Sequence, residues 1–468
     1  MSSRSATLSK LLQTNNYIDL SIFTDIPATV AVEAFKLVAI FSYNVPPPLT
    51  SDNIIPVACL AAFLSMTEDH SPNNLLKLSL SFFSSQILPN WNSTVKAFKC
   101  TELLISHAQQ LGLIEACLNS ISGKAFADPS LLNPPFPVDS KPSACRRLFS
   151  SSSSSSSSNE DITSLSLPLF ELAIACLSLS GISPDHIGHC LFRYANKGCQ
   201  ETSSIYERSK NKKIIESVVG LIPNKRGSVH ASNLLQILRA AIDLHANKAC
   251  IHGLESMIAM QLTEVSIEDL LTHDIECMKR ILSYFIASCE TESNAKEAEF
   301  VIEIMEEYAG EMAREGSLGK DEFVGFMDRM RVLLDHLGRC YDGVYRAVDI
   351  YLDAHGDLTE REREEVCRVL SCRRMSEEAC VHAAQNERLP MRFVAQVLFI
   401  GQMRIREVLI NGDELSSSEK ERKKKVMIME EEEEEMKMEM EKVKKKRKKG
   451  VWKEMKELFG CKSGCDKE

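Results

Sequence analysis

The sequence predicts a mostly α-helical fold, and three observations lead to this class. Apolar residues recur at helical spacing in most segments of the chain. Helix starts and stops punctuate these segments, such as the turn at Gly181–Pro184 and the pair Thr359 and Glu362. Strand-like alternation is confined to residues 18–22, which predict one short strand at most.

A first helical unit is expected over residues 1–126. Three consecutive prolines, Pro46–Pro48, separate its first two helices, and Asp52 is the predicted N-cap of the second. The expected helices are Ala31–Phe41, Val57–Met66, Asn73–Leu88, Ser93–Gln110 and Leu113–Ser122.

The composition changes over residues 127–160, where several prolines precede an unbroken serine run, Ser150–Ser158. Such a segment buries too little apolar surface to offset its chain entropy, so we expect a linker. Residues 161–411 then form a larger unit of short helices with no fixed repeat, which predicts an irregular helical array. Its expected helices lie on both sides of Gly181–Pro184, on both sides of Pro223–Gly227, and at Leu254–Leu262, Ile267–Leu271, Asp274–Ser288 and Glu297–Glu315.

The best-punctuated part of this unit is the stretch Tyr341–Leu409. It begins with one apolar stripe at helical spacing, made of Tyr341, Val344, Tyr345, Val348, Tyr351 and Leu352. Gly356 ends that helix, a capping box starts the next, and Ser376 opens a third. Leu389 and Pro390 precede a fourth helix, whose residues 393–405 are apolar on most sides and are expected to be buried.

The tail, residues 412–468, is charged and low in complexity, and two interpretations stay open. With Val426 at position a, the a and d positions of a heptad are Val426, Met429, Glu433, Met436, Met440, Val443 and Arg447, which indicate a short coiled coil. The acidic block Glu430–Glu435 and the basic run after it equally suit a solvated helix or a disordered tail.

Composition limits the function classes. The 468 residues carry a formal net charge of -10, which argues against nucleic acid as a partner of the whole chain. The 16 cysteines contain no CxxC pair, so we interpret them as buried free thiols in a reducing compartment. Neither a bilayer-spanning apolar run nor a secretory signal is recognisable, which predicts a cytoplasmic protein or one peripheral at a membrane.

No reactive constellation stands out, so we expect neither an enzyme nor a cofactor or metal site. The motifs HExxH, GxSxG, GxGxxG and the P-loop are absent from the sequence. His186 and His189 lie beside Cys190 without further ligands at suitable spacing, so core or surface histidines are the preferred interpretation. Asp353, His355 and Asp357 are interpreted as turn and capping residues.

The C-terminus combines a basic cluster with a short amphipathic segment. Trp452 and Phe459 fall on one face of it, and two nearby cysteines could carry acyl chains. This arrangement suits an anionic membrane surface; a nuclear-localisation-like run and a solvated tail are the alternatives. The candidate membrane-contact residues are Lys444, Lys445, Lys446, Arg447, Lys448, Lys449, Trp452, Phe459, Cys461 and Cys465.

Three blocks of sequence resemble the plant phototropism-signalling adaptors, the non-phototropic hypocotyl and root phototropism type of BTB/POZ domain-containing proteins. The blocks are DITSLSLPLFELAI with the following turn, VGLIPNKRGSVHASNLLQILRAA, and the stretch beginning YDGVYRAVDIYLDAH. Residues 1–126 are similar to the C-terminal part of the family's BTB/POZ domain with the helices after it. The N-terminal half of that domain has no counterpart in the sequence, which puts BTB-type dimerisation and a full cullin-binding surface in doubt.

The resemblance implies a partial BTB/POZ unit, a helical family domain and a charged tail. It implies a substrate-specific adaptor of a cullin-3-based ubiquitin ligase in plant light or growth signalling; a non-ligase helical scaffold at the plasma membrane is the alternative. The implied partners are a cullin-3-type scaffold and a protein substrate or photoreceptor-like signalling protein, and homo- or hetero-oligomers stay open. The family-signature residues assigned to the partner-binding domain are Tyr341, Asp342, Tyr345, Asp349, Tyr351, Gln385, Asn386, Glu387, Arg388, Leu389 and Pro390.

Overall fold

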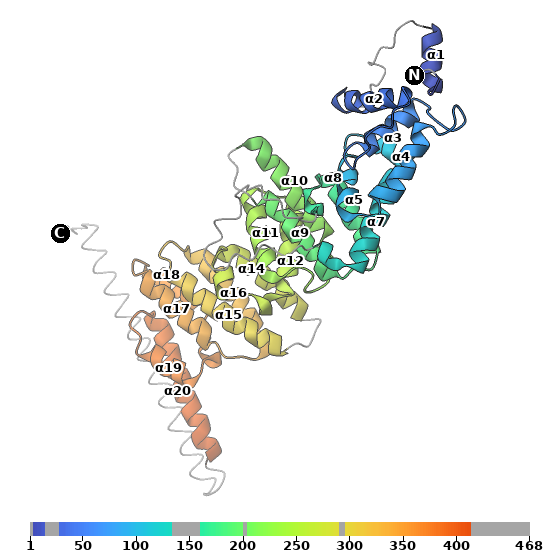
Figure 1. The fold of residues 1–468 in the computed structure, drawn as a ribbon. Helices are drawn as coiled ribbons and strands as arrows, with labels where there is room; N and C mark the ends of the chain where they lie inside the picture. Colours follow the sequence, from blue (N-terminus) through green and yellow to red (C-terminus); the bar gives the residue numbers. More distant parts are fainter. Residues whose placement is uncertain (1–2, 15–27, 133–159, 200–203, 290–294, 413–468) are drawn as a thin grey trace, which may run out of the picture. The chain divides into compact units, whose positions relative to one another are not determined.

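The computed structural model describes residues 3–14, 28–132, 160–199, 204–289 and 295–412 (Figure 1). Over these ranges the regular structure is helical throughout and contains no strand, which confirms the predicted mostly α fold. The candidate strand at residues 18–22 lies outside the described ranges. The chain divides into two compact units, Met1–Val369 and Leu370–Glu468.

The first helices of unit Met1–Val369 pack mainly on their neighbours in the chain, α2 on α3, α3 on α4 and α5 on α7. Almost all of α3 is buried, as its uniformly apolar sequence requires. The π-helical turn Phe83–Ile87 directly extends α4. The bounds are α1 Ala6–Thr14, α2 Ala28–Ser42, α3 Ile54–Phe63, α4 Leu75–Phe82, α5 Trp91–Lys99, α6 Ile105–Gln110 and α7 Leu113–Ala127.

Two local predictions for this region are wrong. The expected helix Ser93–Gln110 is broken between α5 and α6, where the buried Thr101 hydroxyl donates to the Phe98 carbonyl at 2.7 Å. A hydroxyl that bonds nearby backbone competes with continued helix. Asp52 is not the N-cap of α3; Asn53 holds that position, and its amide bonds to Thr50 and Pro48 instead of capping the helix.

The remaining helices of the unit form the expected irregular array. The closest neighbours are α9 with α10, α11 with α12, α12 with α14, α14 with α16, and α15 with α17. One of them, α16, has no counterpart among the predicted helices. The bounds are α8 Leu167–Leu179, α9 Pro184–Gly198, α10 Ile205–Leu221, α11 Ala231–Asp243, α12 Lys248–Ala259, α13 Ile267–Leu270, α14 Ile275–Cys289, α15 Ala295–Ala313, α16 Lys320–Leu337, α17 Asp342–Ala354 and α18 Glu360–Cys367.

The residues on either side of the Pro- and Ser-rich segment, Leu132 and Asp161, both contact α9. Arg193 on α9 donates to the Leu132 carbonyl at 3.1 Å and forms an ion pair with Asp161. Next to it, the Trp91 indole donates to the Glu160 carbonyl at 2.8 Å. The helices before this segment and those after it are therefore joined by direct contacts, and α7 also packs on α8.

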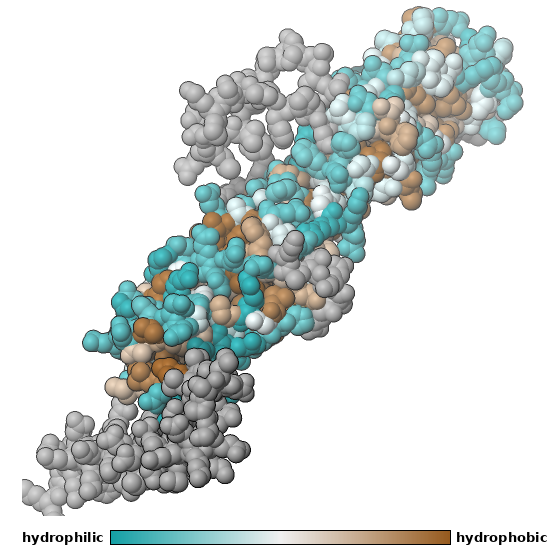
Figure 2. Space-filling view, turned by 90° about the horizontal axis from the view of Figure 1, so that it is seen from below, coloured by the Kyte–Doolittle hydropathy of each residue, from teal (hydrophilic) through white to brown (hydrophobic). Residues whose placement is uncertain are grey.

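Unit Leu370–Glu468 contains the 3-10 turn Cys372–Arg374, α19 (Glu377–Ala384) and α20 (Met391–Gly412). Ser376 caps α19 by accepting from the Ala379 amide at 3.1 Å, as predicted. The prediction that residues 393–405 are a buried helix is wrong. Only one side of α20 packs on α19 and the 3-10 turn, and apolar side chains on the other side remain exposed. Elsewhere, apolar residues reach the visible surface in separate patches between hydrophilic ones (Figure 2).

Candidate protein-recognition site

The signature helix α17 is fixed by a buried apolar side, which confirms the predicted stripe. Tyr341, Tyr345 and Tyr351 are all buried, together with the valines between them. The helix packs against α15, α16 and α18. The predicted capping box starts α18: Thr359 accepts from the Glu362 amide at 3.3 Å, and Glu362 accepts from the Thr359 amide at 2.9 Å.

Tyr351 makes two aromatic contacts through its ring and one hydrogen bond through its hydroxyl. Its ring stacks on Phe323 with the centroids 4.2 Å apart and on His355 at 3.9 Å. Its hydroxyl donates to the Leu318 carbonyl at 2.9 Å. Burial raises the pKa of Tyr351 to about 12, so the phenol stays neutral and acts as a structural donor. His355, in turn, bonds through Nδ1 to the Tyr351 carbonyl at 2.9 Å, which fits the predicted helix-ending role.

A groove of about 400 Å³ lies between α15 and α17, beside the signature residues. The Glu306 carboxyl group lies directly against Gly343, where a Cβ would come within 1.8 Å of its carboxyl carbon. Burial raises the pKa of Glu306, and the nearby Arg346 opposes this shift. The groove is lined by Glu303, Glu306, Glu307, Gly310, Glu311, Arg314, Gly343, Arg346, Ala347 and Ile350. Four carboxylates against two guanidinium groups would favour a positively charged side chain from a partner.

The other signature residues connect α19 to α20 in the second unit. Asn386 is buried and accepts from the Arg388 amide at 3.0 Å, while Leu389 and Pro390 are also buried. Gln385, Glu387 and Arg388 are exposed. The connection is thus a turn with buried residues on one side and three exposed polar side chains. Asp342 and Asp349 on α17 are half-buried, and the partner-binding role of the whole set stays a prediction.

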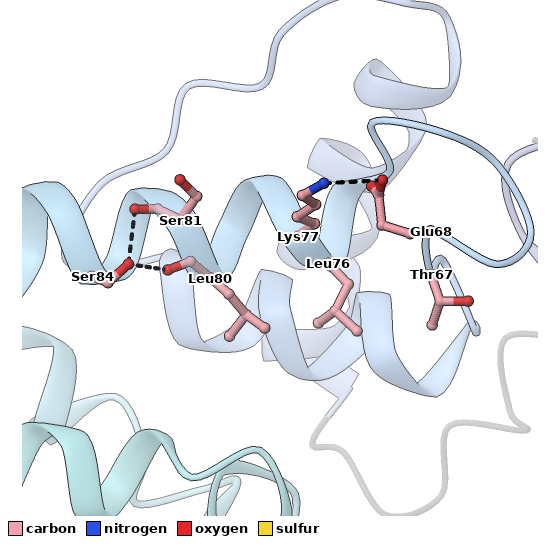
Figure 3. Close-up of a pocket in the computed structure, with 7 residues that line it drawn as sticks. All are labelled: Thr67, Glu68, Leu76, Lys77, Leu80, Ser81 and Ser84. Carbon is pink, nitrogen blue, oxygen red and sulfur yellow. Dashed lines mark hydrogen bonds and ion pairs between the residues drawn. The ribbon is translucent and has the colours of Figure 1, made fainter.

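A second hollow, of about 470 Å³, lies along α4 (Figure 3). Leu76 and Leu80 lie side by side on it, and both are half-buried. Glu68 closes one end by accepting from the Asn74 amide at 2.9 Å and pairing with Lys77 at 3.2 Å. These contacts hold the pKa of Glu68 below its usual value. The lining residues are Thr67, Glu68, Leu76, Lys77, Leu80, Ser81 and Ser84.

Sequence reasoning missed both hollows. Small residues on facing helices, Gly310 on α15 with Gly343 and Ala347 on α17, were the available signal for the first. The hollow on α4 follows a pattern of alternating leucine and serine that equally fits an ordinary surface helix. The membrane-contact candidates Lys444–Lys449, Trp452, Phe459, Cys461 and Cys465 lie outside the described residues.

The prediction of buried thiols holds for most of the described cysteines, but Cys340 is exposed. Burial raises the pKa of the Cys190 thiol to about 12, and burial lowers the pKa of His189. Within the described ranges, no group of three or more His, Cys, Asp or Glu side chains could hold a metal ion. Over the same residues, no helix is long and apolar enough to cross a membrane.

Comparison with known proteins gives the family. Residues 157–380 match the NPH3 family model. The chain is 31% identical to the Arabidopsis thaliana BTB/POZ domain-containing protein At3g03510, over 98% of this chain and 90% of that protein. It is 30% identical to At5g03250, another BTB/POZ domain-containing protein of that plant, over 86% of this chain and 77% of the relative. For a third, At5g66560, the identity is 31% and the match spans 81% of this chain and 63% of the relative, less than two thirds of its length.

No solved structure matches the chain. The resemblance proposed from three sequence blocks is confirmed by these relatives and by the matched domain. The names of the family and of the relatives point to adaptor- or scaffold-type proteins that act through protein–protein contacts. The chain belongs to the NPH3 family of BTB/POZ domain-containing proteins.

Proposed function

We propose that the protein is a substrate-specific adaptor of a cullin-3-based ubiquitin ligase in plant light or growth signalling. Residues 1–126 would face the ligase, residues 161–411 would hold a protein substrate or photoreceptor-like partner, and residues 412–468 would tune assembly. Such an adaptor does no bond chemistry. It raises the effective concentration of substrate at the ligase, which requires two surfaces in a geometry that allows both to be occupied.

One observation carries this proposal: the first helices and the NPH3-family helices contact each other directly. Arg193 binds both Leu132 and Asp161, and Trp91 binds Glu160, so the long segment between residues 132 and 160 does not set the separation of the two surfaces. A stiff connection loses less entropy than a flexible tether when both partners are bound. This arrangement supports a two-sided adaptor.

The proposal is tested by size-exclusion chromatography of the purified full chain with the N-terminal region of cullin-3. We expect co-elution, and we expect Leu103→Glu to weaken it, because Leu103 is an exposed apolar residue in the turn between α5 and α6. Leu179→Glu is the matched control, since Leu179 is exposed on α8 beyond residue 126. If the unaltered chain does not co-elute, with or without an added BTB N-terminal half, this chain has no ligase role.

A second candidate is a non-ligase scaffold at the plasma membrane, and the basic run Lys444–Lys449 before Trp452 favours it. Each basic residue near an anionic surface contributes about 1 kcal/mol to membrane binding. The full chain should sediment with vesicles that contain phosphatidylserine and stay in solution with purely zwitterionic ones. Replacing the six basic residues with glutamate should abolish the sedimentation; unchanged sedimentation would exclude this contact.

A further inference from the structure

The groove between α15 and α17 has a floor of small and apolar residues. Gly310 on α15 lies there with Gly343, Ala347 and Ile350 on α17, and the groove has a volume of about 400 Å³. Gly310 leaves room in it, since a Cβ at this position would meet only the Ile350 Cδ1 atom, at 3.7 Å. Because both walls are helices packed on each other, the groove is a fixed feature of the fold.

The wall formed by α15 carries a row of carboxylates. Glu303, Glu307 and Glu311 are four residues apart, so they lie on one face of the helix at intervals of about 6 Å. All three are exposed. Glu311 pairs with Arg314, whereas Glu303 and Glu307 have no ion pair or hydrogen bond within the part of the chain that the structure describes. The row therefore presents uncompensated negative charge to the groove.

A fourth carboxylate lies deeper in the groove. Glu306 is half-buried, and its carboxyl group fills the space where any residue larger than Gly343 would place its Cβ. Among the described residues it also has neither an ion pair nor a hydrogen bond. Burial raises the pKa of Glu306, and although Arg346 opposes the shift, Asp342 and Glu303 add to it. Because Glu306 is already partly desolvated, a positively charged group gains more by binding it than by binding a fully hydrated carboxylate.

We propose that this groove binds an arginine-bearing segment of a partner protein. Exposed carboxylates alone would fit a solvated helix face, but here they border an enclosed groove with the desolvated Glu306 inside it. In an extended peptide, side chains on one face repeat about every 6.6 Å, which matches the spacing of the glutamate row. Arginine fits best, because its guanidinium group binds a carboxylate through two parallel hydrogen bonds and is more weakly hydrated than an ammonium group.

This inference rests on the proposed function, in which residues 161–411 hold a partner, and it names the chemistry of that partner. Its test contains no cullin-3. A failure to bind the peptide would therefore leave the proposed ligase contact untouched, and a failure to co-elute with cullin-3 would leave the groove untouched.

The probe is a fluorescent peptide with blocked ends, in which three arginines alternate with alanines, and its control has glutamine in place of arginine. Fluorescence anisotropy with the purified full chain should show binding of the arginine peptide only. Glu303→Gln with Glu307→Gln should raise the Kd at least about tenfold. The matched control is Glu360→Gln with Glu364→Gln, which removes the same charge at the same spacing from exposed positions of α18 and should leave the Kd within about twofold.

A second variant separates the groove from the charge around it. Gly310→Leu fills the groove and changes no charge, so it should also raise the Kd at least about tenfold. Gly123→Leu on α7, where a Cβ would meet nothing within 4 Å, is the matched control and should leave the Kd unchanged. Circular dichroism of each variant checks that the helices are intact.

Unchanged binding in either groove variant would overturn the proposal, for example if the acidic block Glu430–Glu435 held the peptide instead. Equal weakening by the α18 pair would also overturn it, because the peptide would then respond to the net charge of the protein. The same holds if the arginine and glutamine peptides bind alike or if neither binds.

Discussion

Gly188 lies where α9 meets the turn before α11 so closely that no larger residue fits. A Cβ at this position would be 1.7 Å from the Ser228 carbonyl oxygen and 3.0 Å from a methyl group of Val229. The turn cannot yield easily, because the Ser228 hydroxyl donates to the Pro223 carbonyl at 3.1 Å and its amide donates to the Lys225 carbonyl at 3.2 Å. Gly188→Ala therefore has to push the backbone of α9 and the turn apart by roughly 1 Å.

Two terms of opposite sign decide the result. Alanine gains about 1 kcal/mol over glycine inside a helix. Overpacking a closely packed contact costs about 1–3 kcal/mol, and the upper end applies because the obstacle is backbone. We expect a net loss of about 2 kcal/mol of unfolding free energy. At about 2.1 cal/mol/K of unfolding entropy per residue, a unit of the size of Met1–Val369 then loses about 2–3 °C in Tm.

Gly123 provides the matched control, since it lies inside α7 and a Cβ there would meet nothing within 4 Å. Gly123→Ala should raise Tm, because only the propensity term acts. Thermal unfolding followed by circular dichroism measures both variants. Hydrogen exchange adds a local readout, as amides at the start of α11 should exchange faster in Gly188→Ala. If the Tm of Gly188→Ala equals or exceeds that of the unaltered protein, Gly188 does not lie this close to Ser228.

Three further predictions concern buried polar groups. Tyr351→Phe keeps both ring stacks but leaves the Leu318 carbonyl without its donor, so chemical unfolding should show a loss of about 1 kcal/mol; a loss above about 3 kcal/mol would mean that the ring itself is displaced. Arg280 binds the fully buried Glu255 at 2.7 Å, so Arg280→Ala should lower the free energy of unfolding by about 3 kcal/mol. The double variant Glu255→Leu with Arg280→Met should recover most of this stability, because neither charge is then buried without its partner. A further loss of stability in the double variant would contradict this explanation. Burial lowers the pKa of His273 below its ordinary 6.5. As pH falls below 6.5, the unfolded chain therefore takes up the proton before the folded protein does. The stability that the neutral, buried ring contributes is lost over this range. The Tm difference between the protein and His273→Gln should narrow from about pH 8 to about pH 5.5; a constant difference would exclude this linkage.

Features that depend on neighbours in the chain could be predicted from the sequence. The stripe on α17, the capping box at Thr359 and the Ser376 cap each need only residues within one or two helical turns. The expected helix Ser93–Gln110 is broken by a short-range hydrogen bond, which the Thr101 hydroxyl donates to the backbone between α5 and α6. The helix α16 was missed although its apolar residues recur at helical spacing, because charged residues separate them.

Features that depend on distant residues could not be predicted. Gly188 and Ser228 are forty positions apart, and nothing local says that they touch. The groove between α15 and α17 likewise needs Gly343 and Glu306 to meet. The exposure of one side of α20 was missed for the same reason: the sequence shows apolar residues on several sides but not how many of those sides find a neighbour.

The signature residues divide into buried ones that fix the fold and exposed ones that could contact a partner. Tyr341, Tyr345 and Tyr351 are buried, so they constrain how α17 packs and would affect binding only through the fold. Gln385, Glu387 and Arg388 are exposed on a turn whose backbone is fixed by buried Asn386. Only the exposed side chains can contact a partner directly. Substitutions at such surface positions usually have little effect on stability. A chain with these buried tyrosines can therefore keep its fold while its partner is selected at such exposed turns and grooves.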